Sequence, residues 1–283
     1  MRFSKMQGAG NDFIIIMAEE VRGIEYGILA KKVCDRHFGI GADGLMIVEN
    51  SESKDVKMNY YNSDGSIGEM CGNGIRCFSK FVYEKGIVRK KVFTVETLAG
   101  EKDIKLEVTE EGKVQSILVD MGSPSLKAKD VPVVTEKESY INENIKLNGS
   151  NIVVSSILMG VPHTIVFVEE LGENIVYEIG PQIERYNIYP RGTNVNFVQV
   201  VNKELIKVDT WERGSGKTLA CGTGVCGSVY VANLLGYVAR KAEVRVPGGK
   251  LNIHIDDDNR VFMKGTAKFI CDGKYYLEES LKF

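Results

Sequence analysis

A seven-residue pattern that the chain carries twice constrains its fold more than any other feature. The first copy is CGNGIRC at positions 71–77, and the second is CGTGVCG at positions 221–227. Each copy begins Cys-Gly-x-Gly and leads into an apolar segment with the periodicity of a helix. Each segment stops at a glycine, Gly86 or Gly236, which is the residue that a helix C-cap favours. We therefore expect two similar halves, each built around one helix.

Cys71 and Cys221 come at or just before the first turn of these helices. Backbone N–H groups and the positive end of the helix dipole favour an anion there, so the thiolate of a cysteine is stabilised. The glycines let a ligand approach the backbone closely. A lone cysteine in this place is more often a small buried hydrophobe. Duplication of the whole unit favours the other interpretation, in which two thiols work together.

Strand patterns fill most of the remaining chain, and one further helix is predicted over 25–38. GIGADG at 39–44 is interpreted as a tight turn, because it follows a helix and precedes a strand, the reverse of a dinucleotide site. Strands are predicted at 3–6, 13–17, 45–48, 56–61, 91–97, 103–109, 114–120, 152–158, 164–168, 194–201, 205–211, 242–246, 250–255, 260–264 and 267–271. The pattern breaks around 121–124, where we place a domain boundary.

The predicted fold class is α/β (α+β), with two pseudo-symmetric halves that are each a curved, mostly antiparallel sheet around a central helix. The active site is expected in the cleft between the halves, where the two helix N-termini would face each other.

The charge balance argues against some classes of partner. A formal net charge of −2 does not suit nucleic acid or an anionic membrane, and no apolar run approaches the roughly 20 residues of a membrane helix. The opening MRFSK has no signal-peptide layout, and six cysteines without one indicate reduced thiols. We expect a cytoplasmic protein that acts on a small molecule.

Several rival chemistries fit the residues less well. The cysteine pairs at 71/77 and 221/226 do not have the spacing of a zinc knuckle, and the chain has three histidines. A single nucleophilic cysteine with His163 as its base leaves the second unit unexplained. GKT at 216–218 ends like a P-loop, but Trp211 stands where the leading glycine is required.

Two opposed thiols suit the inversion of a stereocentre. One thiolate removes the α-proton from one face, and a thiol delivers a proton to the other face. Charge then develops on the substrate carboxylate, and bare backbone amides at two helix N-termini are donors that stabilise it. No cofactor is needed in principle, and no lysine has a recognisable pyridoxal context. The residues therefore predict a cofactor-independent racemase or epimerase without naming its substrate.

Eight segments spread over almost the full length carry a resemblance to a known family. They are FSKMQGAGNDF, GIGADG, YNSDGS, CGNGIRC, VFTVETLAG, MGVPH, TNVNF and WERGSGKTLACGTGVC. In sequence and order they resemble diaminopimelate epimerase. The resemblance implies interconversion of LL- and meso-diaminopimelate in bacterial lysine and peptidoglycan biosynthesis, and a homodimer. It also implies that the last strand returns to the first half, giving domains of 1–120 with about 268–283, and 121–267.

The resemblance also implies roles for individual residues. Cys71 and Cys221 would be the acid/base pair, with His163 and Glu212 tuning the thiols. Backbone amides that hold the reacting carboxylate would belong to Gly72, Asn73, Gly222 and Thr223. The amino and carboxylate groups of the substrate would be bound by Asn11, Asn62, Asn194, Glu212 and Arg213. The other cysteines, Cys34, Cys77, Cys226 and Cys271, are interpreted as packing residues.

Simpler interpretations exist for some of these residues. Asn62 and Asn194 lie in turn-like sequence, where asparagine is a common turn former, and His163 alone resembles an ordinary loop histidine. Arg213 is the strongest single case, because a guanidinium suits bidentate binding of a carboxylate.

Two positions depart from the family pattern. Gly44 stands where some members have a substrate-facing glutamine, and Val161 stands where many have a substrate-binding asparagine. The alternatives are therefore a racemase of another amino acid, such as histidine, and a binding or scaffold protein that has kept the fold. The presence of both Cys71 and Cys221 argues against the scaffold.

Overall fold

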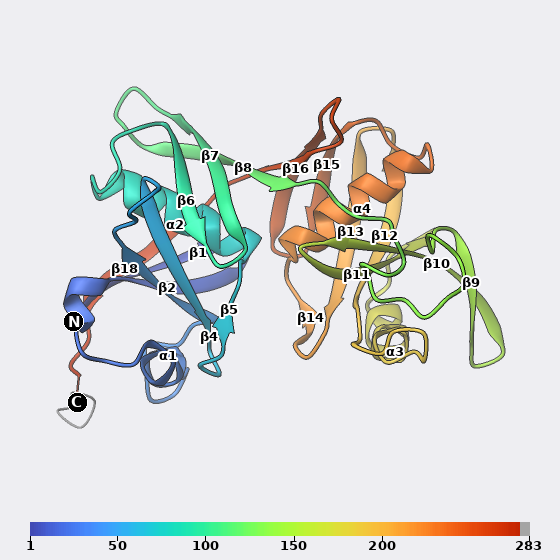
Figure 1. Cartoon of the computed structure of the whole chain (residues 1–283), viewed down its shortest axis with the longest axis horizontal. Helices are drawn as coiled ribbons and strands as arrows, with labels where there is room; N and C mark the ends of the chain where they lie inside the picture. The colour runs from blue at the N-terminus through green and yellow to red at the C-terminus, as the bar shows by residue number, and fades with distance from the viewer. Residues whose placement is uncertain (278–283) are drawn as a thin grey trace. The chain divides into compact units, whose positions relative to one another are not determined.

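The computed structural model describes residues 1–277 of the chain. By their internal contacts the residues form two compact units. Unit 1 consists of Met1–Val119 and the C-terminal segment from Gly265 onward, and unit 2 consists of Asp120–Lys264. The colour ramp of Figure 1 follows this division, since the last, red strand lies among the blue strands of unit 1.

Unit 1 is a mixed sheet with two α-helices and one 3-10 helix. Its strands are β1 (Arg2–Gly8), β2 (Asn11–Met17), β3 (Gly44–Glu49), β4 (Val56–Asn62), β5 (Ile67–Gly68), β6 (Val92–Thr97), β7 (Gly100–Val108), β8 (Val114–Gly122, which runs past the end of the unit) and β18 (Lys268–Lys274). Its helices are η1 (Ala18–Val21), α1 (Tyr26–Cys34) and α2 (Gly72–Glu84).

The strands of unit 1 pair in the order β18-β1-β2-β3-β4-β6-β7-β8, with β5 hydrogen-bonded to β4. The β2–β3 and β4–β6 pairs are parallel, and helices α1 and α2 lie in the chain between their strands. All other pairs are antiparallel, as hairpin connections allow. The buried stretch 13–16 of β2 is apolar throughout, which is the expected pattern of a strand covered on both faces.

Unit 2 repeats this plan. Its strands are β9 (Glu143–Leu147), β10 (Ser150–Met159), β11 (Val161–Val168), β12 (Asn194–Asn202), β13 (Leu205–Glu212), β14 (Gly216–Thr218), β15 (Lys241–Val246), β16 (Gly249–Ile255) and β17 (Val261–Gly265). Its helices are α3 (Glu173–Glu184) and α4 (Gly222–Leu234). The order is β9-β10-β11-β12-β13-β15-β16-β17 with β14 on β13, and again only β11–β12 and β13–β15 are parallel.

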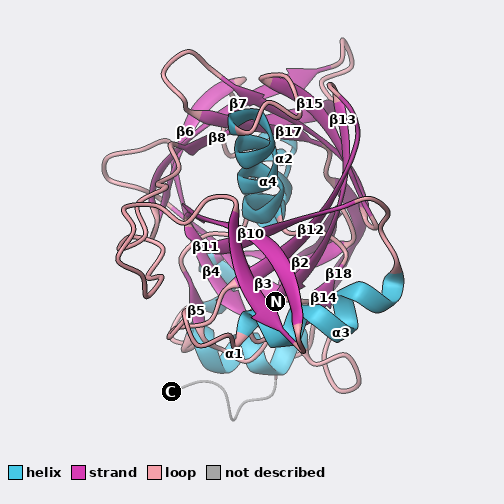
Figure 2. Ribbon diagram, turned by 90° about the vertical axis from the view of Figure 1, so that its right-hand side faces the viewer, coloured by secondary structure: helices cyan, strands magenta, loops and turns pink. Residues whose placement is uncertain are grey.

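Between the start of β2 and the end of α2, residues differ by 150 in sequence number from their equivalents between the start of β11 and the end of α4. Phe13 pairs with Gly44 as His163 pairs with Asn194, and Met46 pairs with Tyr60 as Asn196 pairs with Thr210. Cys71 and Cys221 show the same offset. The predicted fold of two pseudo-symmetric halves, each a mostly antiparallel sheet around one helix, is confirmed, and Figure 2 shows how far strands outweigh helices.

Helices α2 and α4 are the central helices of their units, and they approach the strands closely because of one glycine each. A Cβ on Gly74 would collide with the Cε atom of Met46 on β3. A Cβ on Gly224 would collide with Oδ1 of Asn196 on β12. A side chain of the sheet therefore lies directly against the second glycine of each Cys-Gly-x-Gly unit. Both helices end as predicted, with Gly86 and Gly236 at φ 75° and 76°.

Several elements differ from the sequence prediction. The helix predicted over 25–38 ends at Cys34, because the carboxylate of Asp35 accepts the backbone N–H groups of His37 and Phe38 and closes a turn. Helix α3 is missing from the prediction, since Gly180 and Pro181 within it have the appearance of a helix break. The short strands β5, β9 and β14 are also missing from it.

The connection between the predicted strands 152–158 and 164–168 is much shorter in the structure. Only Gly160, at φ 73°, separates β10 from β11, so His163 lies in a strand and not in a loop. Asn62 and Asn194 likewise lie at the ends of β4 and β12. The domain limits 1–120 with 268–283 and 121–267 stay a prediction, because compact packing does not show that either part folds by itself.

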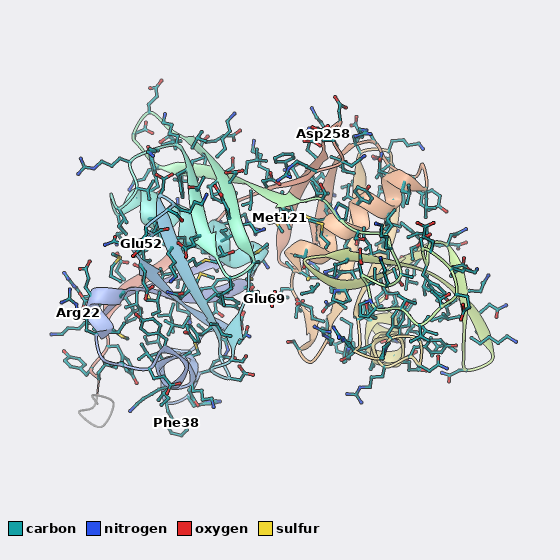
Figure 3. All side chains as sticks on the ribbon, viewed as in Figure 1. Arg22, Phe38, Glu52, Glu69, Met121 and Asp258 are labelled. Atoms are coloured by element: carbon teal, nitrogen blue, oxygen red, sulfur yellow. The ribbon has the colours of Figure 1, made fainter. Side chains whose placement is uncertain are left out.

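Three of the four cysteines assigned to packing are buried: Cys34, Cys77 and Cys226. The assignment is wrong for Cys271, which is exposed on β18. Figure 3 shows the side chains of both units, among them Phe38 beside α1, which projects outward with 88% of its surface exposed. Within residues 1–277 no helix is both long and apolar enough to cross a membrane.

Candidate functional site

Each of the two predicted cysteines is the N-cap of its helix. Cys71 has extended backbone angles of φ −132° and ψ 121°, and its carbonyl oxygen accepts the N–H of Ile75 at 2.8 Å. Cys221 has φ −108° and ψ 108°, and its carbonyl oxygen accepts the N–H of Val225 at 2.9 Å. In neither case does the side chain of the cysteine cap the helix.

The backbone amides that follow each cysteine belong to the first turn of the helix. Gly72 and Asn73 in unit 1 and Gly222 and Thr223 in unit 2 therefore have N–H groups that no helical carbonyl can accept. Such groups, with the helix dipole, form an anion-binding site. The predicted carboxylate-holding residues are thus placed at two helix N-termini.

In unit 1, Cys71 lies against the side chain of Asn11 at the start of β2. The thiol donates to Oδ1 of Asn11 across 3.5 Å, and Nδ2 of Asn11 donates to Oδ2 of Asp43 at 2.5 Å. A carboxylate only accepts hydrogen bonds, so it fixes the orientation of the amide, with Oδ1 toward the sulfur. Arg36 bridges Asp43 and Asp12 at 2.7 and 2.8 Å and holds this cluster together.

Ionic contacts also set the charge of Asp12. Burial raises the pKa of Asp12, but the hydrogen bonds and charges of Arg36 and Lys5 outweigh it, so the pKa lies below the ordinary value of 3.8. The carboxylate of Asp12 therefore stays ionised at neutral pH.

A second polar contact to Asn11 comes from helix α2. Nδ2 of Asn73 donates to the same Oδ1 of Asn11 at 3.5 Å. The guanidinium of Arg76, which is fully buried, donates to Oδ1 of Asn73 and to the carbonyl of Gly72, both at 2.9 Å. A further bond to the carbonyl of Thr266 measures 3.3 Å. Arg76 therefore orients Asn73, and Asn73 in turn helps to orient Asn11.

In unit 2, Cys221 lies against its neighbour in the motif. Its sulfur is 3.5 Å from Oγ1 of Thr223, and that hydroxyl is 3.0 Å from Nε2 of His163. Nδ1 of His163 is 3.1 Å from Nδ2 of Asn196, whose Oδ1 accepts the hydroxyl of Thr210 at 3.1 Å. His163 is fully buried. Burial, followed by the charge of Arg213, lowers the pKa of His163 to about 3, so the imidazole is neutral.

The side chain of Asn62, at the end of β4, is fixed by hydrogen bonds to Tyr60 and Ser66. The hydroxyl of Tyr60 donates to Oδ1 of Asn62 at 2.8 Å, and Nδ2 of Asn62 donates to Oγ of Ser66 at 2.9 Å. A Cβ on Gly44 would lie 2.6 Å from Cε2 of Tyr60 and 2.8 Å from the carbonyl of Tyr61. The ring of Tyr60 therefore fills the space that a side chain at position 44 would need.

Arg213 follows β13 and is positioned by two other residues. Its backbone N–H donates to Oδ1 of Asn194 at 2.9 Å, while Nδ2 of Asn194 donates to the carbonyl of Pro162 at 2.9 Å. Glu184 at the end of α3 accepts the indole N–H of Trp211 at 2.7 Å and the N–H of Gly214 at 3.2 Å. The residues on both sides of the Glu212–Arg213 pair are thus tied to one carboxylate.

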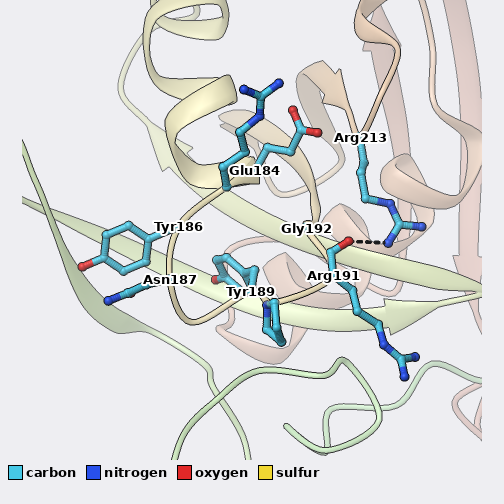
Figure 4. A pocket seen from close by; sticks show the side chains of 9 residues that line it. Glu184, Tyr186, Asn187, Tyr189, Arg191, Gly192 and Arg213 are labelled. Carbon is cyan, nitrogen blue, oxygen red and sulfur yellow. Dashed lines mark hydrogen bonds between the residues drawn. The ribbon is translucent and has the colours of Figure 1, made fainter.

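A pocket of about 410 Å³ lies in unit 2 beside Arg213 (Figure 4). It is lined mainly by the loop after α3, including Arg191 and Tyr189. The guanidinium of Arg213 donates to the carbonyl of Arg191 at 2.8 Å, which fixes one side of it toward the loop. Oε1 of Glu212 on β13 accepts a hydrogen bond from the hydroxyl of Thr218 on the neighbouring strand β14 at 2.6 Å.

The structure brings together Asn11, Asn73 and Cys71 in unit 1, and His163, Thr223 and Cys221 in unit 2. It also joins Asn194 to Arg213, whereas Asn62 contacts Tyr60 and Ser66. Sequence reasoning missed the residues behind them: Asp43, Arg76, Tyr60, Asn196, Thr210 and Glu184. Asn196 could have been found from the repeat. The offset of 150 places it opposite Met46, and a polar residue at a position that is apolar in the other unit indicates a special role. Within residues 1–277 no group of three His, Cys, Asp or Glu side chains is arranged to hold a metal.

Known proteins resemble this chain over nearly its whole length. The sequence model of the family described as diaminopimelate epimerase matches residues 3–127 and 155–270. A diaminopimelate epimerase of Alkaliphilus metalliredigens is 50% identical over 276 residues, 97% of each chain. One of Clostridium perfringens is 51% identical over 277 residues, 97% of this chain and 99% of the relative. A solved structure of a probable proline racemase from Agrobacterium radiobacter superposes with a TM-score of 0.74 at 14% identity, covering 98% of this chain and 93% of that one.

Proposed function

We infer that this chain, which belongs to the diaminopimelate epimerase family, is an isomerase that interconverts LL- and meso-diaminopimelate. The observation that carries this inference is the half-identical sequence over nearly the full length of the relatives. The repeated placement of a cysteine as helix N-cap supports it independently, because that placement suits proton transfer beside a bound carboxylate.

We propose a two-base mechanism for Cys71 and Cys221. The thiolate of one cysteine takes the α-proton, and the electron pair of the broken C–H bond moves into the carboxylate. The thiol of the other cysteine then gives its proton to the opposite face of the carbon. Each turnover leaves the two sulfurs with exchanged protonation states. The chain's own groups carry every proton in this scheme, so it needs no cofactor.

Backbone amides are proposed to stabilise the charge that develops on the carboxylate. Gly72 and Asn73 would donate from α2, and Gly222 and Thr223 from α4. This assignment draws support from the first-turn position of all four residues. Their alignment with the two helix dipoles favours the same charge.

The second amino-acid end of the substrate is assigned to Arg213, Asn194, Asn62 and Glu212, and Asn11 to the groups around the reacting carbon. Arg213 offers the cation for a carboxylate, and Asn194 holds the backbone from which it extends. His163 and Glu212 are assigned to tuning the thiols. We also propose that the enzyme is a cytoplasmic homodimer in lysine and peptidoglycan biosynthesis, and the dimer can be checked by light scattering.

The substrate is tested by incubating the enzyme with amino acids in deuterated water and reading α-deuterium by mass spectrometry. LL-Diaminopimelate is expected to exchange, and L-histidine is the competing substrate. If histidine is turned over and diaminopimelate is not, the substrate assignment is wrong while the two-thiol mechanism survives.

Val161→Asn provides a variant control for the same experiment. A missing hydrogen bond to a charged group costs roughly 1.5–3 kcal/mol, which corresponds to about 10–150-fold in affinity. We expect this variant to keep diaminopimelate as its substrate and to bind it more tightly.

A further inference from the structure

A chain of polar side chains runs from the interior of unit 2 to the sulfur of Cys221. Its members, in order, are Thr210 on β13, Asn196 on β12, His163 on β11 and Thr223 on α4, each within 3.1 Å of the next. Each of the three strand residues is at most 2% exposed. Buried polar groups destabilise a core unless they are fully hydrogen-bonded, so a chain of them calls for an explanation.

Unit 1 shows that the fold itself does not need this chain. The positions equivalent to His163, Asn196 and Thr210 are occupied by Phe13, Met46 and Tyr60. Phe13 and Tyr60 pack edge to face with their ring centroids 6.1 Å apart, and the hydroxyl of Tyr60 points to Asn62. The same scaffold is therefore stable with largely apolar packing at these three positions.

The orientation of the Asn196 amide determines which group donates in each hydrogen bond of this chain. A Cβ built on Gly224 would collide with Oδ1 of Asn196, so a Cα–H of that glycine is directed toward this oxygen. An oxygen accepts such a contact, whereas an NH₂ group there would place hydrogen against hydrogen. The oxygen also accepts the Thr210 hydroxyl. The NH₂ group of Asn196 must then face His163 and donate to Nδ1.

This orientation fixes the tautomer of the imidazole. A neutral histidine carries one proton, and a nitrogen that accepts from Asn196 cannot carry it. The proton is therefore on Nε2, which donates to Oγ1 of Thr223 at 3.0 Å. A hydroxyl that accepts from one side has its own proton left for another acceptor, and the sulfur of Cys221 lies 3.5 Å away.

We propose that the Thr223 hydroxyl is a positioning group that donates a hydrogen bond to Cys221, in a direction set by the buried chain of Thr210, Asn196 and His163. A donor favours the charged form of its acceptor, so this bond stabilises the thiolate of Cys221. Cys71 has the opposite arrangement, because Oδ1 of Asn11 can only accept and so favours the thiol. The resting enzyme then holds Cys221 as the base and Cys71 as the acid, an assignment that rests on the proposed function.

Other ionisable groups also act on Cys221. Helix α4 packs against β10–β13 and β16, and alternation along these strands turns two ionisable side chains toward it, His163 on β11 and Glu212 on β13. Arg213 is the next residue in the chain after Glu212. His163 is neutral, and the charges of Glu212 and Arg213 are unchanged by removing the Thr223 hydroxyl. The hydroxyl can therefore be tested alone.

The test is the pH dependence of alkylation of Cys221 by iodoacetamide, read by mass spectrometry of its peptide, in the Cys71→Ala background without substrate. Thr223→Val is expected to raise the midpoint of the alkylation curve by about one pH unit, which makes the reaction about tenfold slower below it. Thr223→Ser should keep the original midpoint. Ser228→Ala, which removes a buried hydroxyl one turn along α4, is the matched control and should also keep it. An unchanged midpoint in Thr223→Val would overturn the proposal.

A measurement on the unaltered protein tests the direction of the chain. With ¹⁵N-labelled histidine, the resonances of His163 should show a neutral ring protonated at Nε2, from pH 7 down to pH 5. A ring protonated at Nδ1, or a cationic ring at pH 7, would overturn the proposal even if every variant folds.

These results are independent of turnover. A Thr223-dependent midpoint in an enzyme that fails to exchange the α-hydrogen of diaminopimelate would support the hydrogen-bond chain and reject the proposed substrate. An enzyme that exchanges the α-hydrogen of diaminopimelate, but whose alkylation midpoint is the same in Thr223→Val, would support the proposed substrate and reject the hydrogen-bond chain.

Discussion

Cys71 in unit 1 and Cys221 in unit 2 occupy equivalent positions of one repeated fold, but their polar surroundings differ in kind. The sulfur in unit 1 faces an asparagine anchored in a charged cluster of Asp43, Asp12 and Arg36. The sulfur in unit 2 faces a hydroxyl anchored in a neutral, buried chain. Features that both units share are explained by the helix N-terminus. Features that differ between the units are candidates for making one cysteine the acid and the other the base.

The difference is visible at two pairs of equivalent positions. Asn11, which accepts from Cys71, has Val161 as its counterpart, and Asn73 has Thr223. The contact to sulfur therefore comes from a strand residue in unit 1 and from the helix itself in unit 2. Repetition of a fold preserves the backbone geometry while the side chains around each sulfur specialise.

The largest effect is expected from removing either sulfur. Cys71→Ala and Cys221→Ala should each reduce epimerisation at least about 10³-fold, because each face of the carbon needs its own proton carrier. The readout is formation of α-deuterated meso-diaminopimelate from LL-diaminopimelate in deuterated water. Cys271→Ala, at the exposed cysteine, is the control and should be fully active. Near-normal epimerisation by either Cys71→Ala or Cys221→Ala would show that the two units do not share the chemistry.

The next effect is on stability and concerns the buried histidine. The pKa of His163 is lowered from 6.5 to about 3, so below pH 6.5 the unfolded chain takes up a proton that the folded chain refuses. Its contribution to the unfolding free energy is complete above pH 6.5 and is lost as the pH falls toward 3. At about 1.4 kcal/mol per pH unit, the loss between pH 7 and pH 5 is about 2 kcal/mol.

Replacing His163 and Asn196 by their unit 1 counterparts, Phe13 and Met46, isolates the contribution of His163 to the pH dependence of stability. The variant His163→Phe with Asn196→Met should lose less stability than the unaltered chain between pH 7 and pH 5. Urea denaturation at both pH values measures the difference. Equal losses in the two proteins would mean that His163 is protonated in the folded state.

A smaller effect is expected from making the unit 1 site resemble unit 2. Asn11→Val copies the counterpart Val161 and removes the acceptor of the Cys71 thiol. One hydrogen bond of about 1.4 kcal/mol corresponds to a tenfold fall in kcat/KM. Alkylation of Cys71 should also begin at lower pH, because the acceptor that favours its thiol is removed. Asn252→Val, at an exposed strand asparagine, is the control, and equal alkylation curves would contradict the role of Asn11.

The smallest effect concerns Glu184, which anchors the chain around Arg213. A glutamine can accept only one of the two bonds from Trp211 and Gly214, so the Arg213 loop should loosen. We expect Glu184→Gln to raise KM a few-fold at an unchanged kcat in steady-state kinetics. Glu178→Gln on the exposed face of α3 serves as the control. A fall in kcat alone would place Glu184 closer to the chemistry than to positioning.

The sequence predicted most elements whose side chains alternate or recur with a clear period. The two cysteine helices and their terminal glycines came directly from the repeated motif, and the four last strands from alternation. Its errors lie where local signals conflict with packing. Gly180 and Pro181 mask helix α3, and the turn residues around Gly160 mask the strand position of His163.

By itself, the sequence determined the repeat and the family and predicted the two thiols, because these depend on residue type and spacing along one chain. Tertiary structure alone decided what stands behind each thiol. Asp43 is 28 residues before Cys71, and Asn196 is 25 before Cys221, and only the pairing of strands brings them under the helix termini. Hydrogen-bond direction depends on such distant neighbours, since an amide or imidazole shows which atom donates only when its partners on other strands are in place.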